Sequence, residues 1–137
     1  MKITPGDIKK LLRSWDVLCV IESGNKGKGF DRKLTARRIK KIRNNRSIEN
    51  LLKRIESFRE CILSESEELD SFEQEIIKEF VISNDSVSMV ADNHYTGTST
   101  VYRVIDSFGD RLYKRMINDK YFEQTVNYLI NRLQKYI

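Results

Sequence analysis

Apolar residues recur at steps of three and four along most of the chain, which is the period of a helix with one buried face. The first such run follows Thr4, which is suited to cap a helix, with Pro5 at the first helical position and Asp7 in the first turn. Its apolar positions are Ile8, Leu11, Leu12, Trp15, Leu18 and Cys19. We therefore predict a helical stretch with one buried stripe in this part of the sequence.

Two further helical runs are predicted between residues 34 and 70. One begins near Leu34 or Thr35 and weakens at Asn44-Asn45, and the other resumes at Ile48 with the spacing of a short coiled-coil seam. The apolar positions are Ile39 and Ile42 in the first run, and Leu51, Leu52, Ile55, Phe58 and Ile62 in the second. The acids that follow are expected on the surface: Glu65, Glu67, Glu68 and Asp70. Since no alternating strand pattern of useful length is present, we expect an all-α fold.

Residues 69–116 carry the most specific pattern. Three helices are expected, with the apolar positions Phe72, Ile76, Ile77, Phe80 and Val81 in the first, Val87, Val90 and Ala91 in the second, and Val101, Val104, Ile105, Phe108, Leu112 and Met116 in the third. Residues 83–86 separate the first two helices, and a tight turn over residues 93–97 separates the others. This is the order of a helix-turn-helix with a supporting helix in front. The alternative is an ordinary three-helix core with the same spacing.

The residue types in this pattern suit DNA binding. Ala91 is small enough to let two helices cross closely, and Val101 and Val104 would anchor the second helix from beneath. Short polar side chains suit phosphate contact in its first turn: Thr98, Ser99 and Thr100. A rotation of 100° per residue directs four side chains outward, into a major groove: Ser99, Tyr102, Arg103 and Asp106. We expect Arg103 to bond guanine O6 and N7, and Tyr102 to pack on a sugar-phosphate or a thymine methyl group.

Three residues of this segment are unusual for the pattern. Tyr95 occupies the turn position where many helix-turn-helix proteins have Gly, and Gly97 follows two residues later, which leaves the turn geometry open. Gly109 lies within the second helix, where Gly costs about 1 kcal/mol relative to Ala unless a bend is required. His94, the only histidine, falls in the turn, and we expect it to pack or to contact a phosphate.

A last amphipathic helix is predicted after Asn118-Asp119, which can cap it. Its apolar positions are Phe122, Val126, Leu129, Ile130 and Leu133. This side either folds back on the rest of the chain or forms a dimer contact. Because one helix-turn-helix reads few base pairs and a dimer reads two half-sites, we favour the dimer.

Charge is strongly segregated along the chain. The formal net charge is +5, to which residues 1–25 contribute +1, residues 26–46 +9, residues 47–85 −7 and residues 86–137 +2. The basic segment 26–46 holds ten bases against one acid, and it overlaps a glycine-rich loop from Ser23 to Gly29. Since Phe30 is its only aromatic residue, we expect this segment to contact duplex phosphates rather than to stack on single strands. The alternative is a solvated helix face beside a mobile loop.

Composition excludes several other classes. No apolar run approaches the ~18 residues of a membrane span, and no secretory signal layout is present, so we expect a soluble cytoplasmic protein. Cys19 and Cys61 fall within helical patterns and predict no disulfide framework, and a single histidine cannot complete a zinc site. The acids from Glu65 to Glu79 suggest a metal-dependent nuclease only weakly, because no Lys or His is placed to assist catalysis. We expect no metal, no cofactor and no enzymatic activity.

A resemblance to a known family rests on three short segments: residues 72–80 (FEQEIIKEF), Val90-Ala91, and residues 99–103 (STVYR). On these residues, the chain from Phe72 to Leu112 resembles the C-terminal helix-turn-helix (region four) of bacterial sigma factors. It is more closely similar to phage regulators of the ArpU and RinA type. The resemblance covers about a third of the chain. It implies an activator of phage late genes for packaging, structure and lysis, acting in a bacterial host cell.

We therefore predict a transcription regulator, a phage late-gene activator, that binds double-stranded DNA sequence-specifically. Residues 1–65 would form an N-terminal helical region, residues 66–117 the helix-turn-helix, and residues 118–137 a dimerisation helix. The expected DNA contacts are Thr98, Ser99, Thr100, Tyr102, Arg103 and Asp106 in the reading helix, and Arg32, Lys33, Arg37, Arg38, Lys40 and Lys41 in the basic segment. RNA polymerase is a further expected partner. Two alternatives stay open: a small phage packaging (terminase) subunit that binds genome DNA, and a sigma-like adaptor that binds RNA polymerase with little DNA affinity.

Overall fold

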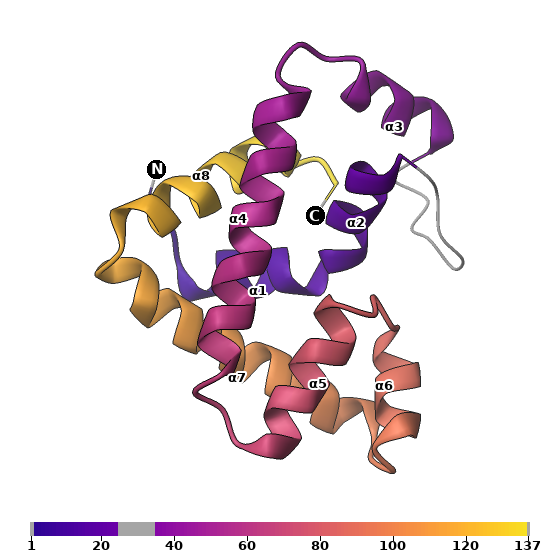
Figure 1. The fold of residues 1–137 in the computed structure, drawn as a ribbon, viewed down its shortest axis with the longest axis vertical. Coiled ribbons are helices and arrows are strands. Elements are labelled where there is room, and N and C mark those ends of the chain that lie inside the picture. The colour runs from indigo at the N-terminus through magenta and orange to yellow at the C-terminus, as the bar shows by residue number, and fades with distance from the viewer. Residues whose placement is uncertain (1, 25–34, 137) are drawn as a thin grey trace.

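The computed structural model describes residues 2–24 and 35–136, and Figure 1 shows their arrangement. Within these ranges the chain is all-α, with eight helices and no strand, as the apolar periodicity predicts. The helices are α1 (Pro5–Arg13), α2 (Trp15–Ser23), α3 (Ala36–Arg43), α4 (Ile48–Ser66), α5 (Ser71–Val81), α6 (Val87–Asn93), α7 (Thr98–Ile117) and α8 (Lys120–Leu133). The candidate contacts Arg32 and Lys33, and the glycine-rich loop beyond Gly24, lie outside the described residues.

The first predicted stretch forms two helices, α1 and α2, that meet at Ser14. The Thr4 hydroxyl accepts a hydrogen bond from the Asp7 N–H, and the Asp7 carboxylate accepts one from the Thr4 N–H, which confirms the predicted cap. Ser14 has φ −96° and ψ 22°, outside helical values, and the chain changes direction there (Figure 1). The bend places the buried Trp15 indole where its N–H donates to the Val81 carbonyl at 3.0 Å.

α1 packs antiparallel against α7. Two ion pairs join these helices in opposite chain order, Lys9 with Asp110 at 3.1 Å and Arg13 with Asp106 at 2.6 Å. Gly109 lies under this contact, where an added Cβ would come within 2.8 Å of the Lys9 Cγ atom. Since α7 continues through this position, the glycine serves the close approach of α1.

α4 runs through the middle of the molecule, and α8 folds back against it (Figure 1). The two helices share an aromatic contact, because the rings of Phe58 and Phe122 stack with centroids 6.0 Å apart. The apolar face of α8 is buried in this chain: Phe122, Val126, Leu129, Ile130 and Leu133. Of the two alternatives, the structure shows the face folded back on the chain, so these side chains are not free for the predicted dimer contact, and dimerisation itself stays a prediction. The Asp119 cap of α8 is confirmed by its hydrogen bond from the Phe122 N–H at 3.0 Å.

Glu65, the first residue of the predicted acidic surface run, is largely covered rather than exposed. The Glu65 side chain is only 17% exposed, and its carboxylate accepts hydrogen bonds from Arg111 at 3.0 Å and Arg115 at 3.4 Å. Both arginines come from α7, which crosses the end of α4 at this point (Figure 1). Glu65, at the end of α4, is thus covered by α7, which lies far away in the sequence.

Buried apolar side chains from all eight described helices form one continuous cluster. The three regions predicted as 1–65, 66–117 and 118–137 therefore share a core rather than packing separately. No helix in the described part of the chain is both long enough and apolar enough to span a membrane.

Candidate nucleic-acid interface

α5 and α6 each begin with a side-chain cap. The Asp70 carboxylate accepts a hydrogen bond from the Glu73 N–H at 2.9 Å, and the Ser86 hydroxyl accepts one from the Met89 N–H at 3.1 Å. Their inward side chains are buried: Ile76, Ile77, Phe80, Val81, Val90 and Ala91. Ala91 is 2% exposed on the helix that packs against α7, which agrees with the need for a small side chain there.

The turn between α6 and α7 is a Schellman-type helix end. The Thr96 N–H donates to the Ala91 carbonyl at 3.0 Å, and the Tyr95 N–H donates to the Asp92 carbonyl at 3.3 Å. Tyr95 has φ 53°, the left-handed conformation that usually favours glycine at this position. Its side chain is 99% exposed, so no packing compensates for the strained backbone. Tyr95 itself therefore adopts the left-handed conformation of the turn, which the sequence alone left open.

His94 ties this turn to α5. Its Nε2 atom hydrogen-bonds the Glu79 carboxylate, and its ring meets the edge of Phe72 with centroids 5.9 Å apart. The Asn93 side-chain amide also donates to Glu79, at 3.3 Å. The packing role predicted for His94 is confirmed, and the polar bonds fix where the start of α7 lies relative to α5.

The first two turns of α7 present polar side chains to solvent. Thr98, Ser99 and Arg103 are exposed, and Thr100 is half-buried. Gly97 precedes the helix and supplies no side-chain cap, so the first N–H groups are open to an anion. The Arg103 side chain has no hydrogen bond or ion pair to any residue in the described ranges. The opposite side is buried as predicted: Val101, Val104, Ile105, Phe108 and Leu112.

Arg13, at the end of α1, contacts two of the residues expected to reach DNA bases, Tyr102 and Asp106. Its guanidinium donates to both Asp106 oxygens, from Nε at 3.0 Å and from Nη2 at 2.6 Å. It also lies 4.6 Å from the centroid of the Tyr102 ring. The hydrogen bond to Asp106 raises the pKa of Arg13 above its usual value. Asp106 was expected to face DNA bases, but its carboxylate is already paired inside the protein.

The basic segment continues into the structure as α3. Ile39 and Ile42 are buried, and the Thr35 hydroxyl accepts a hydrogen bond from the Arg38 N–H at 3.2 Å, which confirms the predicted helix start. Four bases on this helix are exposed: Arg37, Arg38, Lys40 and Lys41. Arg43 differs from them, because it donates to the carbonyls of Ile21 at 2.6 Å and Glu22 at 2.8 Å and so caps the end of α2.

The two sets of expected contacts do not lie together. Figure 1 shows α3 toward one end of the long axis of the molecule, and α6 with the adjoining start of α7 toward the other. A single duplex can meet both sets only if it runs along that axis.

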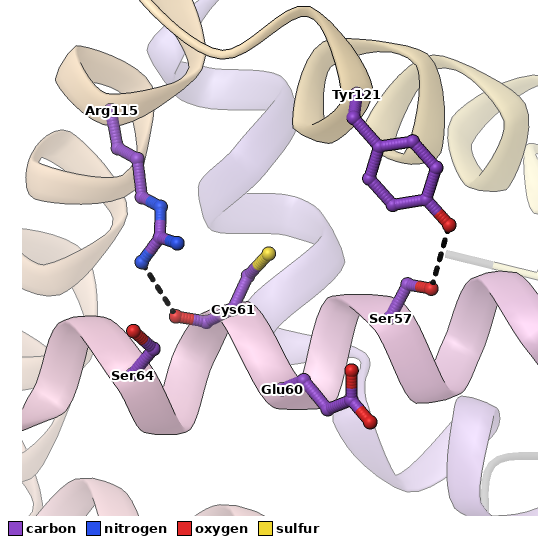
Figure 2. Close-up of a pocket in the computed structure, with 6 residues that line it drawn as sticks. All are labelled: Ser57, Glu60, Cys61, Ser64, Arg115 and Tyr121. Atoms are coloured by element: carbon purple, nitrogen blue, oxygen red, sulfur yellow. Dashed lines mark hydrogen bonds between the residues drawn. The ribbon is translucent and has the colours of Figure 1, made fainter.

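A separate pocket of about 310 Å³ lies between α4, α7 and α8 (Figure 2). It is lined by Ser57, Glu60, Cys61, Ser64, Arg115 and Tyr121. The Ser57 and Tyr121 hydroxyls are 3.2 Å apart, and Arg115 donates to the Cys61 carbonyl at 3.4 Å. Burial raises the pKa of the Cys61 thiol, which disfavours the nucleophilic thiolate. The pocket is polar and does not touch the exposed start of α7.

Within the described ranges, no three His, Cys, Asp or Glu side chains come together as a metal site. Four of the acids from Glu65 to Glu79 have separate roles: Glu65 pairs with α7 arginines, Glu67 pairs with Lys78, Asp70 caps α5 and Glu79 bonds His94.

No family model, no curated protein and no solved structure matches this chain. The resemblance to sigma region four and to phage regulators therefore stays a prediction. The candidate interface rests on the geometry of α6, α7 and their neighbours.

Sequence reasoning missed Arg13. Its partner Asp106 lies 93 residues away, so no local spacing connects them. The one available signal was Gly109, since a glycine inside a helix often marks the close approach of another backbone. That signal indicates a packed neighbour but does not identify α1.

Proposed function

We propose that this protein is a sequence-specific DNA-binding transcription regulator in which α6 and α7 act as a helix-turn-helix and the start of α7 enters the major groove. The observation that carries the proposal is the end of α6: a buried Ala91, a left-handed Tyr95, and an uncapped helix start with exposed Ser99 and Arg103. A helix-turn-helix needs a small residue at the crossing, a tight turn and an exposed second helix.

The charges on α7 support the proposal. Arg103 is exposed and carries a planar fork that suits guanine O6 and N7. The open N–H groups at Thr98 and Ser99 suit a backbone phosphate, which would set the register of the helix on the duplex. Activation of phage late genes is the specific role that we propose, from the resemblance of residues 72–112.

The deciding experiment compares Arg103→Ala with Lys114→Ala. Lys114 is exposed on the same side of α7 but about 16 Å further along the helix. Preferred duplexes are first selected from random sequences with the unmodified protein. Affinities are then measured for a preferred and a scrambled duplex at one salt concentration.

We expect Arg103→Ala to lose about 1–3 kcal/mol of discrimination between these duplexes, with binding to the scrambled duplex nearly unchanged. Lys114→Ala should keep the preference of the unmodified protein. Equal losses on both duplexes would contradict base reading by Arg103. Absence of binding to either duplex would contradict the DNA-binding function itself.

The surface of α5 and α6 favours a second candidate, a sigma-like adaptor that binds RNA polymerase. Residues 66–97 hold eight acids and one base, and Phe72, Ile82 and Met89 are 42%, 61% and 51% exposed there. Acidic and apolar groups together suit a basic segment of a partner protein. Titration with purified bacterial RNA polymerase tests this: an adaptor should bind it, Glu75→Gln with Asp92→Asn should weaken that binding, and Arg103→Ala should not.

A further inference from the structure

Arg13 joins two side chains of the candidate reading surface into one group. It donates two hydrogen bonds to Asp106 and lies against the ring of Tyr102. The side chains of Arg13 and Asp106 are 47% and 33% exposed, and Tyr102 is 40% exposed. The group is therefore fixed within the protein but still open to a ligand.

The pairing changes the charge that α7 would present to DNA. Asp106 lies three residues after Arg103, so the two side chains are neighbours on the helix surface. An unpaired carboxylate there would repel a phosphate backbone. The Arg13 guanidinium cancels that charge, and its position over the Tyr102 ring restricts the ring to one side of α7.

One edge of the Arg13 guanidinium is left for a ligand. Nε and Nη2 are used by Asp106, while Nη1 has no hydrogen-bond partner in the described part of the chain. A guanidinium that is already held by a carboxylate and a ring loses little freedom when it binds a phosphate. Because α1 and α7 are antiparallel, Arg13 lies nearer the start of α7 than Lys9 does.

We propose that Arg13 is a positioning residue of the DNA-reading surface, which holds Tyr102 and neutralises Asp106 beside Arg103 while its Nη1 edge contacts a backbone phosphate. This inference rests on the proposed function, the reading of duplex DNA by α7. The ligand is a B-form duplex in which that phosphate flanks the bases read by Arg103 and Tyr102.

The test compares Arg13→Ala with Lys9→Ala in the full chain. Lys9 is a matched control, because it forms the other ion pair between α1 and α7, with Asp110 at 3.1 Å. Binding to the preferred and scrambled duplexes is measured across a range of salt concentrations, and thermal stability is measured in parallel.

We expect Arg13→Ala to lose about tenfold or more in affinity for the preferred duplex and to prefer it less over the scrambled duplex. The slope of log affinity against log salt concentration should become shallower by ~0.9. Lys9→Ala should stay within about twofold and keep the preference. Adding Asp106→Asn to Arg13→Ala should restore part of the affinity but not the salt slope, since the repulsion is removed and the phosphate contact is not rebuilt.

Arg13→Lys separates charge from positioning. It should keep the salt slope but lose preference, because an ammonium lacks the planar fork that pairs with Asp106 and covers Tyr102. If Arg13 has only a structural role, Arg13→Ala should lower the melting temperature but leave the salt slope and the duplex preference unchanged. That result would overturn the inference. If the unmodified protein shows no preference for any duplex, the proposed function fails together with it.

Discussion

At the scale of single residues, Tyr95 decides how α6 leads into α7. Its left-handed backbone closes the two hydrogen bonds that end α6, and its side chain is almost fully exposed. A residue with a Cβ atom pays about 1–2 kcal/mol in this conformation, whereas glycine does not. The turn is thus held by hydrogen bonds of its neighbours, the Thr96 N–H to the Ala91 carbonyl and the His94 ring to Glu79. The intrinsic backbone preference of Tyr95 opposes this conformation.

Tyr95→Gly should therefore stabilise the protein by about 0.5–1 kcal/mol, because relief of the strained backbone exceeds the entropy that glycine adds to the unfolded chain. Thermal or urea unfolding measures this change. Tyr95→Ala is the control: it removes the same exposed ring but keeps the Cβ, so no gain is expected. Equal stability of the Gly and Ala variants would contradict the role assigned to the backbone.

Burial controls the chemistry of Cys19. Loss of solvent around the thiol raises its pKa to about 11, against a usual value of 9.0, despite the opposing charge of Arg59. In a Cys61→Ser background, alkylation of Cys19 at pH 8 should be about a hundredfold slower in the folded protein than in urea, because the thiolate fraction is lower. Similar rates in both states would contradict the partial burial of the thiol.

The same shift predicts how stability depends on pH. The unfolded thiol loses its proton from about pH 9, while the folded thiol keeps it until about pH 11. Ionisation of the thiol therefore lowers the free energy of the unfolded state first, and the contribution of Cys19 to the free energy of unfolding falls as pH rises through that window. Cys19→Ala should remove this part of the alkaline dependence in urea titrations at pH 8 to 11.

At the scale of elements, the contact of α1 with α7 depends on Gly109. α1 covers the side of α7 next to the candidate reading surface, and it brings Arg13 to Asp106 and Lys9 to Asp110. The missing Cβ at Gly109 allows this approach. The helix that reads DNA in our proposal is thus positioned by α1 as well as by α5 and α6.

Gly109→Val should destabilise the protein by about 1–3 kcal/mol, since its branched side chain would overlap Lys9 and push α1 away. Ser107→Val, on the exposed side of the same helix, is the control and should change stability by less than about 0.5 kcal/mol. Urea unfolding measures both variants. Unchanged stability in Gly109→Val would show that α1 is free to shift.

At the scale of the whole molecule, the basic helix α3 and the start of α7 lie toward opposite ends (Figure 1). A folded chain of this length is about 35–40 Å across, close to the length of one turn of B-form DNA. In our proposal a duplex follows the long axis, with bases read at α7 and phosphates bound at α3.

Duplex length should therefore decide whether α3 contributes. A variant with four alanines replaces Arg37, Arg38, Lys40 and Lys41. On a duplex of about 20 base pairs, its slope of log affinity against log salt concentration should be shallower by ~0.9 per lost phosphate contact. On a hairpin with a stem of about 6 base pairs the same variant should behave like the unmodified protein. A charge-matched control carries alanine at four exposed lysines elsewhere: Lys2, Lys53, Lys120 and Lys135. An unchanged slope on the long duplex would show that α3 faces something other than DNA.

The sequence by itself determined the helices and most of their buried faces. The caps at Thr4 and Asp119 form as predicted, because a cap bonds a backbone group only three residues away. The apolar positions of α7 are buried as predicted, and so are most of those of α4 and α5, because a period of 3.6 residues is a local property of the chain. The exceptions are Leu52, which is half-buried, and Phe72, which is 42% exposed.

Only the tertiary structure decided which faces meet. It paired Arg13 with Asp106 and Glu65 with two arginines of α7, folded α8 onto α4, and separated α3 from the start of α7. Periodicity shows that a helix face is buried but not what covers it, since the fit of two faces depends on residues that lie far apart in the chain. For that reason the sequence identified Arg103 as a candidate contact and left Arg13 unseen.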